Sequence, residues 1–218
     1  MKQETVIKNH KDEEWLWPAE DGVGGVHCCW DYMISHENVP ELISKHVKNR
    51  LVVVQAGGNA GFYVKQYAKL FQTVYTFEPE PVNFYCLTNN VTEYNVLKFQ
   101  GCLGEHHKTV GLDRTLSDTG STHVSGKGVL PTFLIDDLNL PRLNLIHLDI
   151  EGYELFALRG AVNTIKQFYP VIALECHDKW AARYNTSVGD IFNFLEWMGY
   201  QEVGKAMGDK IFKHRDSV

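Results

Sequence analysis

The sequence is poor in cysteine and has no long hydrophobic run. Its five cysteines are odd in number and form no Cys-x-x-Cys pair, which argues against a disulfide framework or a cysteine zinc site and predicts reduced thiols. No apolar stretch reaches the roughly 18 residues that a membrane-spanning helix needs, and the first residues lack the apolar core of a secretory signal. We therefore expect no membrane partner and a cytoplasmic location.

Positive charge is scarce as well. Lys and Arg number 21 against 27 Asp and Glu, which gives a formal net charge of −6, so the total charge does not attract a phosphate backbone. The chain also lacks a lysine-rich stretch and an Asn/Asp-Pro-Pro-Tyr motif of amino methylation. A nucleic-acid partner is therefore not expected. The content of 44% hydrophobic and 22% charged residues is that of an ordinary globular protein.

Three apolar runs are continuous rather than alternating, namely 51–54, 143–150 and 171–174, which is typical of strands covered on both faces. Segments with apolar residues three or four apart, typical of amphipathic helices, lie between and after them. Strands that alternate with helices predict a doubly wound α/β sheet with its ligand crevice at the carboxyl ends of the strands. The expected elements are strands 51–56, 73–78, 96–103, 143–150 and 171–176, helices 60–70, 82–93, 153–167 and 188–198, and an irregular segment 113–128.

Both ends of the chain depart from a plain alternating pattern. Residues 200–214 predict a C-terminal antiparallel hairpin that turns near Gly208 and Asp209. Residues 1–48 contain Trp15, Trp17 and Trp30 and a helical segment at about 39–48. We expect either a lid over the sheet or tryptophans that pack into the core. The predicted organisation is an N-terminal extension at 1–48 and a ligand-binding domain at 49–218.

A glycine-rich turn follows the first buried strand. In "LVVVQAGGNAGFYVKQYAKLFQTVYTFEPEP", Gly57 and Gly61 frame a turn at a helix start, where a ligand can approach the backbone. Glu78 follows 21 residues after Gly57, at the end of the next strand, where a carboxylate accepts hydrogen bonds from ribose hydroxyls. A nicotinamide dinucleotide site prefers the spacing Gly-x-Gly-x-x-Gly. The looser spacing and the terminal hairpin resemble class I S-adenosylmethionine (SAM) methyltransferases.

Ionisable residues gather where two later strands end. In "LIHLDIEGYELFALRGA", His147, Asp149 and Glu151 share one face of a strand or its continuation. Glu175 and His177 end the neighbouring strand, so we expect two acids and two histidines to meet in the crevice. Unpaired carboxylates in such a cleft cost on the order of several kcal/mol each. They must therefore contact a ligand, a cation, each other or the histidines.

These segments resemble FkbM-type methyltransferases. The stretch 145–161 resembles that family's signature, 54–90 resembles its SAM-binding half, and "GSTHV" (120–124), "LIDDL" (134–138) and "YPVIALECH" (169–177) fall where the family has corresponding segments. The resemblance covers roughly residues 50 to 178. It implies a seven-stranded Rossmann-like fold, SAM as the methyl donor, and O-methylation of a hydroxyl on a small molecule or a carbohydrate.

The resemblance also implies site residues. The residues expected to contact SAM are Gln55, Gly57, Gly58, Asn59, Gly61, Glu78 and Asp149. Among them, Glu78 would hold the ribose and Asp149 would lie near the methionine amino group or the acceptor. The family commonly has Asp where this chain has Gln55, which can serve only as a neutral acceptor.

The acceptor must lose a proton on O-methylation. His177 is the first choice of general base, because imidazole titrates nearest neutral pH, with Asp149 or Glu175 orienting it. His147 is the second choice, or else a hydrogen-bonded strand histidine. We predict no metal, although a divalent cation held by Asp149, Glu151 and Glu175 remains an alternative. Two other functions stay open, a nucleic-acid methyltransferase and a non-catalytic module that binds SAM or a dinucleotide.

Overall fold

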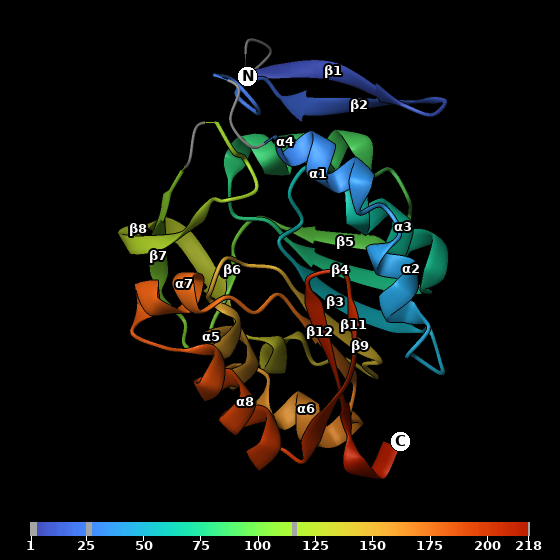
Figure 1. Ribbon diagram of the computed structural model, residues 1–218, viewed down its shortest axis with the longest axis vertical. Coiled ribbons are helices and arrows are strands. Elements are labelled where there is room, and N and C mark those ends of the chain that lie inside the picture. The colour runs from blue at the N-terminus through green and yellow to red at the C-terminus, as the bar shows by residue number, and fades with distance from the viewer. Residues whose placement is uncertain (1–3, 25–27, 115–116, 218) are drawn as a thin grey trace.

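The computed structural model describes residues 4–24, 28–114 and 117–217, and its centre is a single twisted sheet (Figure 1). Within these ranges the sheet has seven strands in the order β11-β12-β10-β9-β3-β4-β5. The strands from β10 to β5 are parallel, β12 is antiparallel to β10, and β11 is antiparallel to β12. Their bounds are β3 (Val52–Ala56), β4 (Thr73–Phe77), β5 (Val96–Phe99), β9 (Leu145–Leu148), β10 (Val171–Leu174), β11 (Tyr200–Ala206) and β12 (Asp209–His214).

This arrangement confirms the predicted doubly wound sheet with a C-terminal antiparallel hairpin. The hairpin turns at Met207 and Gly208, within a residue of the predicted position. Residues 1–3, 25–27, 115–116 and 218 belong to predicted segments but lie outside the described residues. None of the helices in the described ranges has both the length and the apolarity needed to cross a membrane.

Helices cover both faces of the sheet, which explains the continuous apolar runs. In β3, Val53 packs with one hydrophobic cluster, whereas Val52 and Val54 pack with a second cluster on the opposite face. Successive side chains of a strand point to opposite faces, so a strand with two covered faces is apolar throughout. The first cluster includes residues of α1 (Cys29–Ser35), α2 (Val39–Ser44), α3 (Phe62–Leu70) and α4 (Pro81–Asn90), and the second includes residues of α5 (Glu154–Arg159), α6 (Val162–Phe168) and α8 (Val188–Trp197).

The N-terminal hairpin of β1 (Thr5–His10) and β2 (Glu13–Pro18) lies over α4 (Figure 1). The side chain of Asn90 accepts a hydrogen bond from the backbone N–H of Leu16 and donates one to its carbonyl, both at 2.8 Å. Trp15, Trp17 and Trp30 are buried in the cluster that α3 and α4 share. Of the two alternatives for these tryptophans, the structure shows core packing. The domain boundary at residue 48 stays a prediction.

A small second sheet corrects part of the prediction of an irregular segment at 113–128, because a strand begins at His123, whereas residues 117–122 are irregular as predicted. The sheet pairs β6 (Cys102–Leu103), β7 (Thr109–Asp113) and β8 (His123–Phe133) in the order β6-β8-β7. The partners of β8 lie up to 30 residues earlier in the chain, and its glycine and polar residues hide the strand pattern. The predicted strand 96–103 is also interrupted. Gln100 and Gly101 separate β5 from β6, and a Cβ at Gly101 would lie 2.6 Å from the side chain of Phe133.

The predicted helix 153–167 is broken into α5 and α6. The break lies at Gly160, where a side chain would overlap the carbonyl oxygen of Gly104. A glycine at this point therefore lets the end of α5 approach the loop after β6 closely. The remaining helical elements are α7 (Asp178–Ala181) and the 3-10 turns η1 (Ile135–Leu138), η2 (Ala182–Tyr184) and η3 (Arg215–Ser217). The other predicted elements are present with their ends moved by a few residues.

Candidate active site

The glycine-rich turn after β3 is pressed against the two neighbouring strands. The backbone N–H groups of Gly57 and Gly58 both donate to the carbonyl oxygen of Phe77, at 3.1 and 3.0 Å. Gly57 has φ +85°, and a Cβ at this position would overlap the carbonyl oxygen of Asp149. Only glycine combines this backbone angle with this close approach. The turn thereby fixes where β3, β4 and β9 end relative to one another.

Glu78 is tied to the same turn. Asn59, which has a positive φ of 45°, donates its backbone N–H to Oε2 of Glu78 at 2.7 Å, and Oε1 accepts the N–H of Glu80 at 2.8 Å. The side chain is buried, and this burial raises the pKa of Glu78 to about 7. The structure therefore brings the predicted turn and the predicted acid together at one rim.

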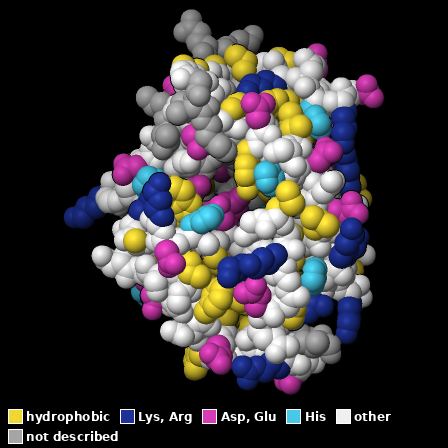
Figure 2. All heavy atoms as spheres, in the orientation of Figure 1, with side chains coloured by type: hydrophobic (Ala, Val, Ile, Leu, Met, Phe, Trp, Pro, Cys, Tyr) yellow, Lys and Arg dark blue, Asp and Glu magenta, His cyan; other side chains and the backbone are white. Residues whose placement is uncertain are grey.

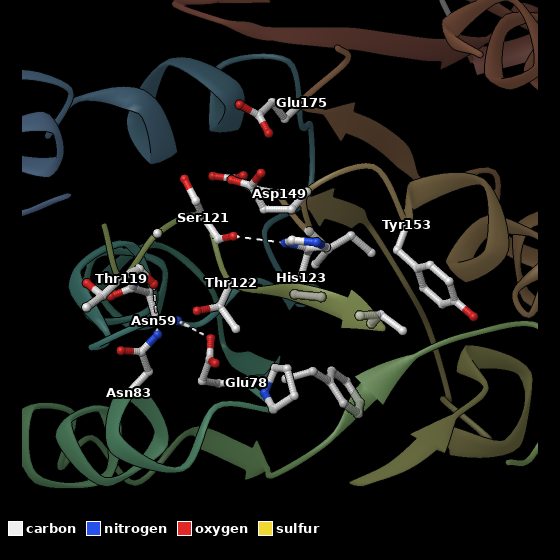
Figure 3. A pocket seen from close by; sticks show the side chains of 18 of the residues that line it. Asn59, Glu78, Asn83, Thr119, Ser121, Thr122, His123, Asp149, Tyr153 and Glu175 are labelled. Atoms are coloured by element: carbon white, nitrogen blue, oxygen red, sulfur yellow. Dashed lines mark hydrogen bonds between the residues drawn. The ribbon is translucent and has the colours of Figure 1, made fainter. Parts of the chain in front are cut away.

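A cavity of about 410 Å³ opens beside this rim, within the size range of small-molecule sites. Figure 2 shows a hollow on this face, with acidic side chains inside it and histidine and hydrophobic side chains around it. Figure 3 shows Glu175 and Asp149 at one end, Glu78 and Asn59 at the other, and His123 between them. The predicted site residues that line the cavity are Gly57, Asn59, Glu78, Asp149, Glu175 and His177.

Gln55, Gly58 and Gly61 lie behind the turn rather than on the cavity wall. The amide of Gln55 is fully buried, accepts from the hydroxyl of Thr76 at 2.6 Å and donates to the carbonyl of Gly57 at 2.9 Å. A Cβ on Gly58 would lie 2.9 Å from Oγ1 of Thr76, and one on Gly61 would lie 2.6 Å from a neighbouring valine methyl. In this structure the three residues support the turn and do not face the cavity.

His147 also lies away from the cavity. It is fully buried, its Nδ1 lies 2.9 Å from the hydroxyl of Tyr67, and its Nε2 lies 3.0 Å from Oδ2 of Asp209. Both ring nitrogens are thus engaged with protein groups. The geometry matches the alternative of a hydrogen-bonded strand histidine, and it leaves no route from this ring to a ligand in the cavity.

Three carboxylates form a compact cluster on the cavity wall. Oxygens of Asp149, Glu151 and Glu175 all lie within 4.8 Å of one another. Burial and then repulsion from Asp149 raise the pKa of Glu151 to about 8, and burial and then repulsion from Glu151 raise that of Glu175 to about 8. Burial and then Glu175 also raise the pKa of Asp149. The cluster can hold protons or a cation, since oxygens are the ligands that Mg²⁺ and Ca²⁺ prefer.

His177 stands at the edge of the cavity, directly before α7. Its Nε2 lies 3.6 Å from Oε1 of Glu175, and its side chain is 57% exposed. This pair can act as a base with an orienting acid, because catalytic hydrogen bonds are often long before a substrate binds. Glu154, by contrast, accepts the backbone N–H groups of Ile150 and Gly152 at 3.1 and 3.2 Å. It stabilises the turn that carries Glu151.

Several lining residues were not predicted. They are Tyr32, Tyr63, Asn83, Thr119, His123, Tyr153 and Trp180, among others. Nδ1 of His123 lies 3.2 Å from the carbonyl oxygen of Ser121 (Figure 3). Most of these lining residues lie within or beside segments that resemble the family, namely Tyr63 and Asn83 in 54–90, Tyr153 in 145–161, and Thr119 and His123 beside or within "GSTHV", but none was singled out as a site residue. Tyr32 comes from the N-terminal quarter, where no motif pointed to it.

The sequence matches one family model, that of the methyltransferase FkbM domain, over residues 55–202. This range is well over half of the chain. The chain belongs to this family. The predicted resemblance to this family is confirmed. No curated protein matches the sequence.

Solved structures resemble the FkbM-family protein at low sequence identity. A TehB-like SAM-dependent methyltransferase from Corynebacterium glutamicum ATCC 13032 Kitasato has a TM-score of 0.51 and 10% identity, over 85% of this chain and 93% of that chain. The methyltransferase FkbM from Methylobacillus flagellatus KT has a TM-score of 0.49 and 17% identity, over 80% of this chain and 50% of that chain. This chain thus spans about half the length of that protein.

A third structure is the N-methyltransferase NodS from Bradyrhizobium japonicum WM9, in complex with S-adenosyl-L-homocysteine (SAH). Its TM-score is 0.47 and its identity 12%, over 84% of this chain and 86% of that chain. At such identities the likeness concerns the fold alone. The likeness to the TehB-like protein confirms the predicted Rossmann-like fold of class I SAM methyltransferases.

Proposed function

We propose that this protein transfers a methyl group from SAM to a hydroxyl of an uncharged small molecule or carbohydrate. One observation carries the proposal. Gly57 and Asn59 of the turn, the acid Glu78 and the group of Asp149, Glu175 and His177 all line the same cavity. In this proposal a nucleoside end and an acid–base end face each other across one space.

The nucleoside end would hold the donor. The carboxylate of Glu78 already accepts two backbone N–H groups, which fix its orientation, and each oxygen keeps a second lone pair for a ribose hydroxyl. The turn at Gly57 presents bare backbone to the ligand. SAM, when bound there, supplies an electrophilic methyl group on a positively charged sulfur.

The acid–base end would activate the acceptor. Much of the rate of a methyl transfer comes from holding donor and acceptor in line and in contact, and a hydroxyl must also lose its proton. His177 is the base in this proposal, and Glu175, 3.6 Å from its Nε2, orients the ring and, once ionised, stabilises its positive charge. Asp149 would face the acceptor or the amino group of the donor.

The charge of the cavity favours an acceptor without phosphate. Among the described residues, none of the side chains that line the cavity is Lys or Arg, whereas five lining side chains are carboxylic acids. A phosphate backbone needs basic side chains to neutralise it, so the lining opposes a nucleic-acid acceptor. A neutral hydroxyl compound needs no such neutralisation.

Binding and turnover measurements test the proposal. We expect calorimetry to show binding of SAM and SAH and no binding of NADH. We expect methyl transfer to neutral hydroxyl compounds and none to their phosphate esters. His177→Ala should lower kcat at least 100-fold and leave the Kd for SAM within twofold. His106→Ala is the control, because its 77% exposed side chain lies outside the cavity.

Other outcomes would redirect or refute the proposal. Absence of SAM binding would refute it, and SAM binding without turnover on any acceptor would favour a binding module. Turnover that is lost in EDTA and restored by Mg²⁺ would assign the cluster of Asp149, Glu151 and Glu175 to a cation that lowers the pKa of the acceptor.

A further inference from the structure

Thr119 joins three parts of the chain that are far apart in sequence. It lies in the loop before β8, is 5% exposed and lines the cavity. Its carbonyl oxygen accepts from Nδ2 of Asn59 at 3.3 Å and from Nδ2 of Asn83 at 3.1 Å. Its hydroxyl donates to Oδ1 of Asp21 at 3.2 Å. Both lone pairs of one loop carbonyl are thereby used by the two asparagines, one on the glycine-rich turn and one on α4.

Asp21 is a buried and ionised anchor for the N-terminal segment. Its carboxylate accepts the backbone N–H groups of Cys29 and Trp30 at 3.0 and 2.9 Å, and the indole N–H of Trp17 at 2.8 Å. Burial opposes ionisation, but these hydrogen bonds hold the pKa of Asp21 below its usual range. The hydroxyl of Thr119 therefore meets a charged oxygen, and such hydrogen bonds are stronger than neutral ones.

Asn59 transmits this anchoring to the nucleoside end. Its positive φ is uncommon for any residue other than glycine. Its side chain is held from two directions, since Oδ1 accepts the N–H of Ala60 at 2.6 Å and Nδ2 donates to Thr119. In this conformation its own N–H lies 2.7 Å from Oε2 of Glu78 (Figure 3). A continuous path of hydrogen bonds thus runs from Asp21 through Thr119 and Asn59 to Glu78.

We propose that Thr119 is a positioning residue for the methyl donor. It connects the N-terminal segment, which lies outside the matched range 55–202, to the turn that orients Glu78. The proposal rests on the proposed function, because it takes SAM and SAH as the ligands of this cavity. It gives the residues before the family domain a role in the affinity for the donor rather than in the chemical step.

The test measures SAH affinity and turnover in matched variants. Thr119→Val keeps the shape of the side chain and removes the hydroxyl. We expect it to raise the Kd for SAH by about 3- to 10-fold, which is less than the full loss of a hydrogen bond to a charged group would give because Thr119 acts through Asn59, and to leave kcat at saturating SAM within twofold. Thr119→Ser, which restores the hydroxyl, should return the Kd to within twofold of the unmodified protein.

A control and a double variant separate positioning from mere destabilisation. Thr164 is similarly buried, with 7% exposed, and donates its hydroxyl to Oδ1 of Asp136 at 2.7 Å, away from the cavity. Thr164→Val should lower the melting temperature without changing the Kd for SAH. In a Glu78→Gln background, Thr119→Val should change the Kd by less than twofold, because effects that pass through one group are not additive.

Each result decides the proposal. The proposal is overturned if Thr119→Val leaves the Kd for SAH unchanged. It is also overturned if Thr119→Val raises this Kd by the same factor with and without Glu78→Gln, or if Thr164→Val raises it equally. Thr119→Ala provides the same measurement if Thr119→Val does not fold. If the unmodified protein binds neither SAM nor SAH, the proposed function fails first, so the two failures are distinguishable.

Discussion

Replacing Glu175 with Gln should stabilise the protein at alkaline pH and not at acidic pH. Burial, followed by repulsion from Glu151, raises the pKa of Glu175 from 4.5 to about 8. The folded protein therefore holds this proton more tightly than the unfolded chain does. The carboxyl group costs no stability below pH 4.5, a cost develops as the pH rises, and it is complete above pH 8.

The magnitude follows from the same values. One pKa unit corresponds to about 1.4 kcal/mol, so the full cost of ionising Glu175 is at most about 5 kcal/mol. We expect about 2 kcal/mol, because the side chain remains 20% exposed and the neighbouring carboxyl groups change their own ionisation in response. For a chain of this length this corresponds to a rise in melting temperature of about 4 to 8 °C at pH 8.5.

Calorimetry in EDTA at pH 5 and pH 8.5 measures the effect, and EDTA prevents a cation from masking the repulsion. Glu196→Gln is the control, because that side chain is 74% exposed on α8, and its melting temperature should change by less than about 1 °C at either pH. An equal effect of Glu175→Gln at both pH values, or a lower melting temperature at pH 8.5, would refute the assignment of a strained carboxylate cluster.

Two further substitutions test the turn and the buried histidine. Gly57→Ala should lower the free energy of unfolding by about 2 kcal/mol or more and weaken SAM binding, because its Cβ would overlap the carbonyl oxygen of Asp149. Calorimetry and ligand titration measure the two effects. Gly208→Ala is the control and should change neither quantity, because its Cβ would lie in open space. Tyr67→Phe removes the hydroxyl that lies 2.9 Å from Nδ1 of His147. It should lower the free energy of unfolding in denaturant by about 1 to 2 kcal/mol and leave kcat within twofold. A large loss of kcat at unchanged stability would instead make His147 catalytic.

The parts of the fold that the sequence could predict are those with local signals. The runs that became β3, β9 and β10 are apolar because helices cover both faces of the sheet. The turn at Gly57 was visible because its backbone angle and close approach allow only glycine. Glu78 was visible because it ends the next strand. These features depend on residues close together in the chain.

The contacts that complete the cavity depend on residues far apart in the chain. Thr119 meets Asp21 across 98 positions and Asn59 across 60, and no local pattern records such a pairing. The histidines show a second limit. Strand alternation placed His147 and Asp149 on one face, but it does not tell which of them reaches the cavity. His147 lies within β9, hydrogen-bonded to Tyr67, whereas Asp149 lies just past the end of the strand, on the cavity wall.

The acidic cluster should make the protein distinguish the donor from its spent form, if SAM occupies the cavity as proposed. SAM carries a positive sulfonium that SAH has lost. Ionised carboxylates favour the sulfonium, and those of Glu151 and Glu175 ionise with pKa values of about 8. The ratio of the Kd for SAH to the Kd for SAM should therefore rise between pH 6 and pH 8.5.

A single added charge at about 4 Å is worth about 1 kcal/mol even at the dielectric constant of bulk water, which predicts a rise of at least about fivefold in this ratio. Titration calorimetry with both ligands at the two pH values measures it, and Glu175→Gln should reduce the rise because it removes one of the titrating charges. A ratio that stays constant with pH would mean that the sulfonium does not lie near these carboxylates. The donor would then have to bind with its sulfur away from Asp149, and the assignment of His177 as the base would lose its geometric support.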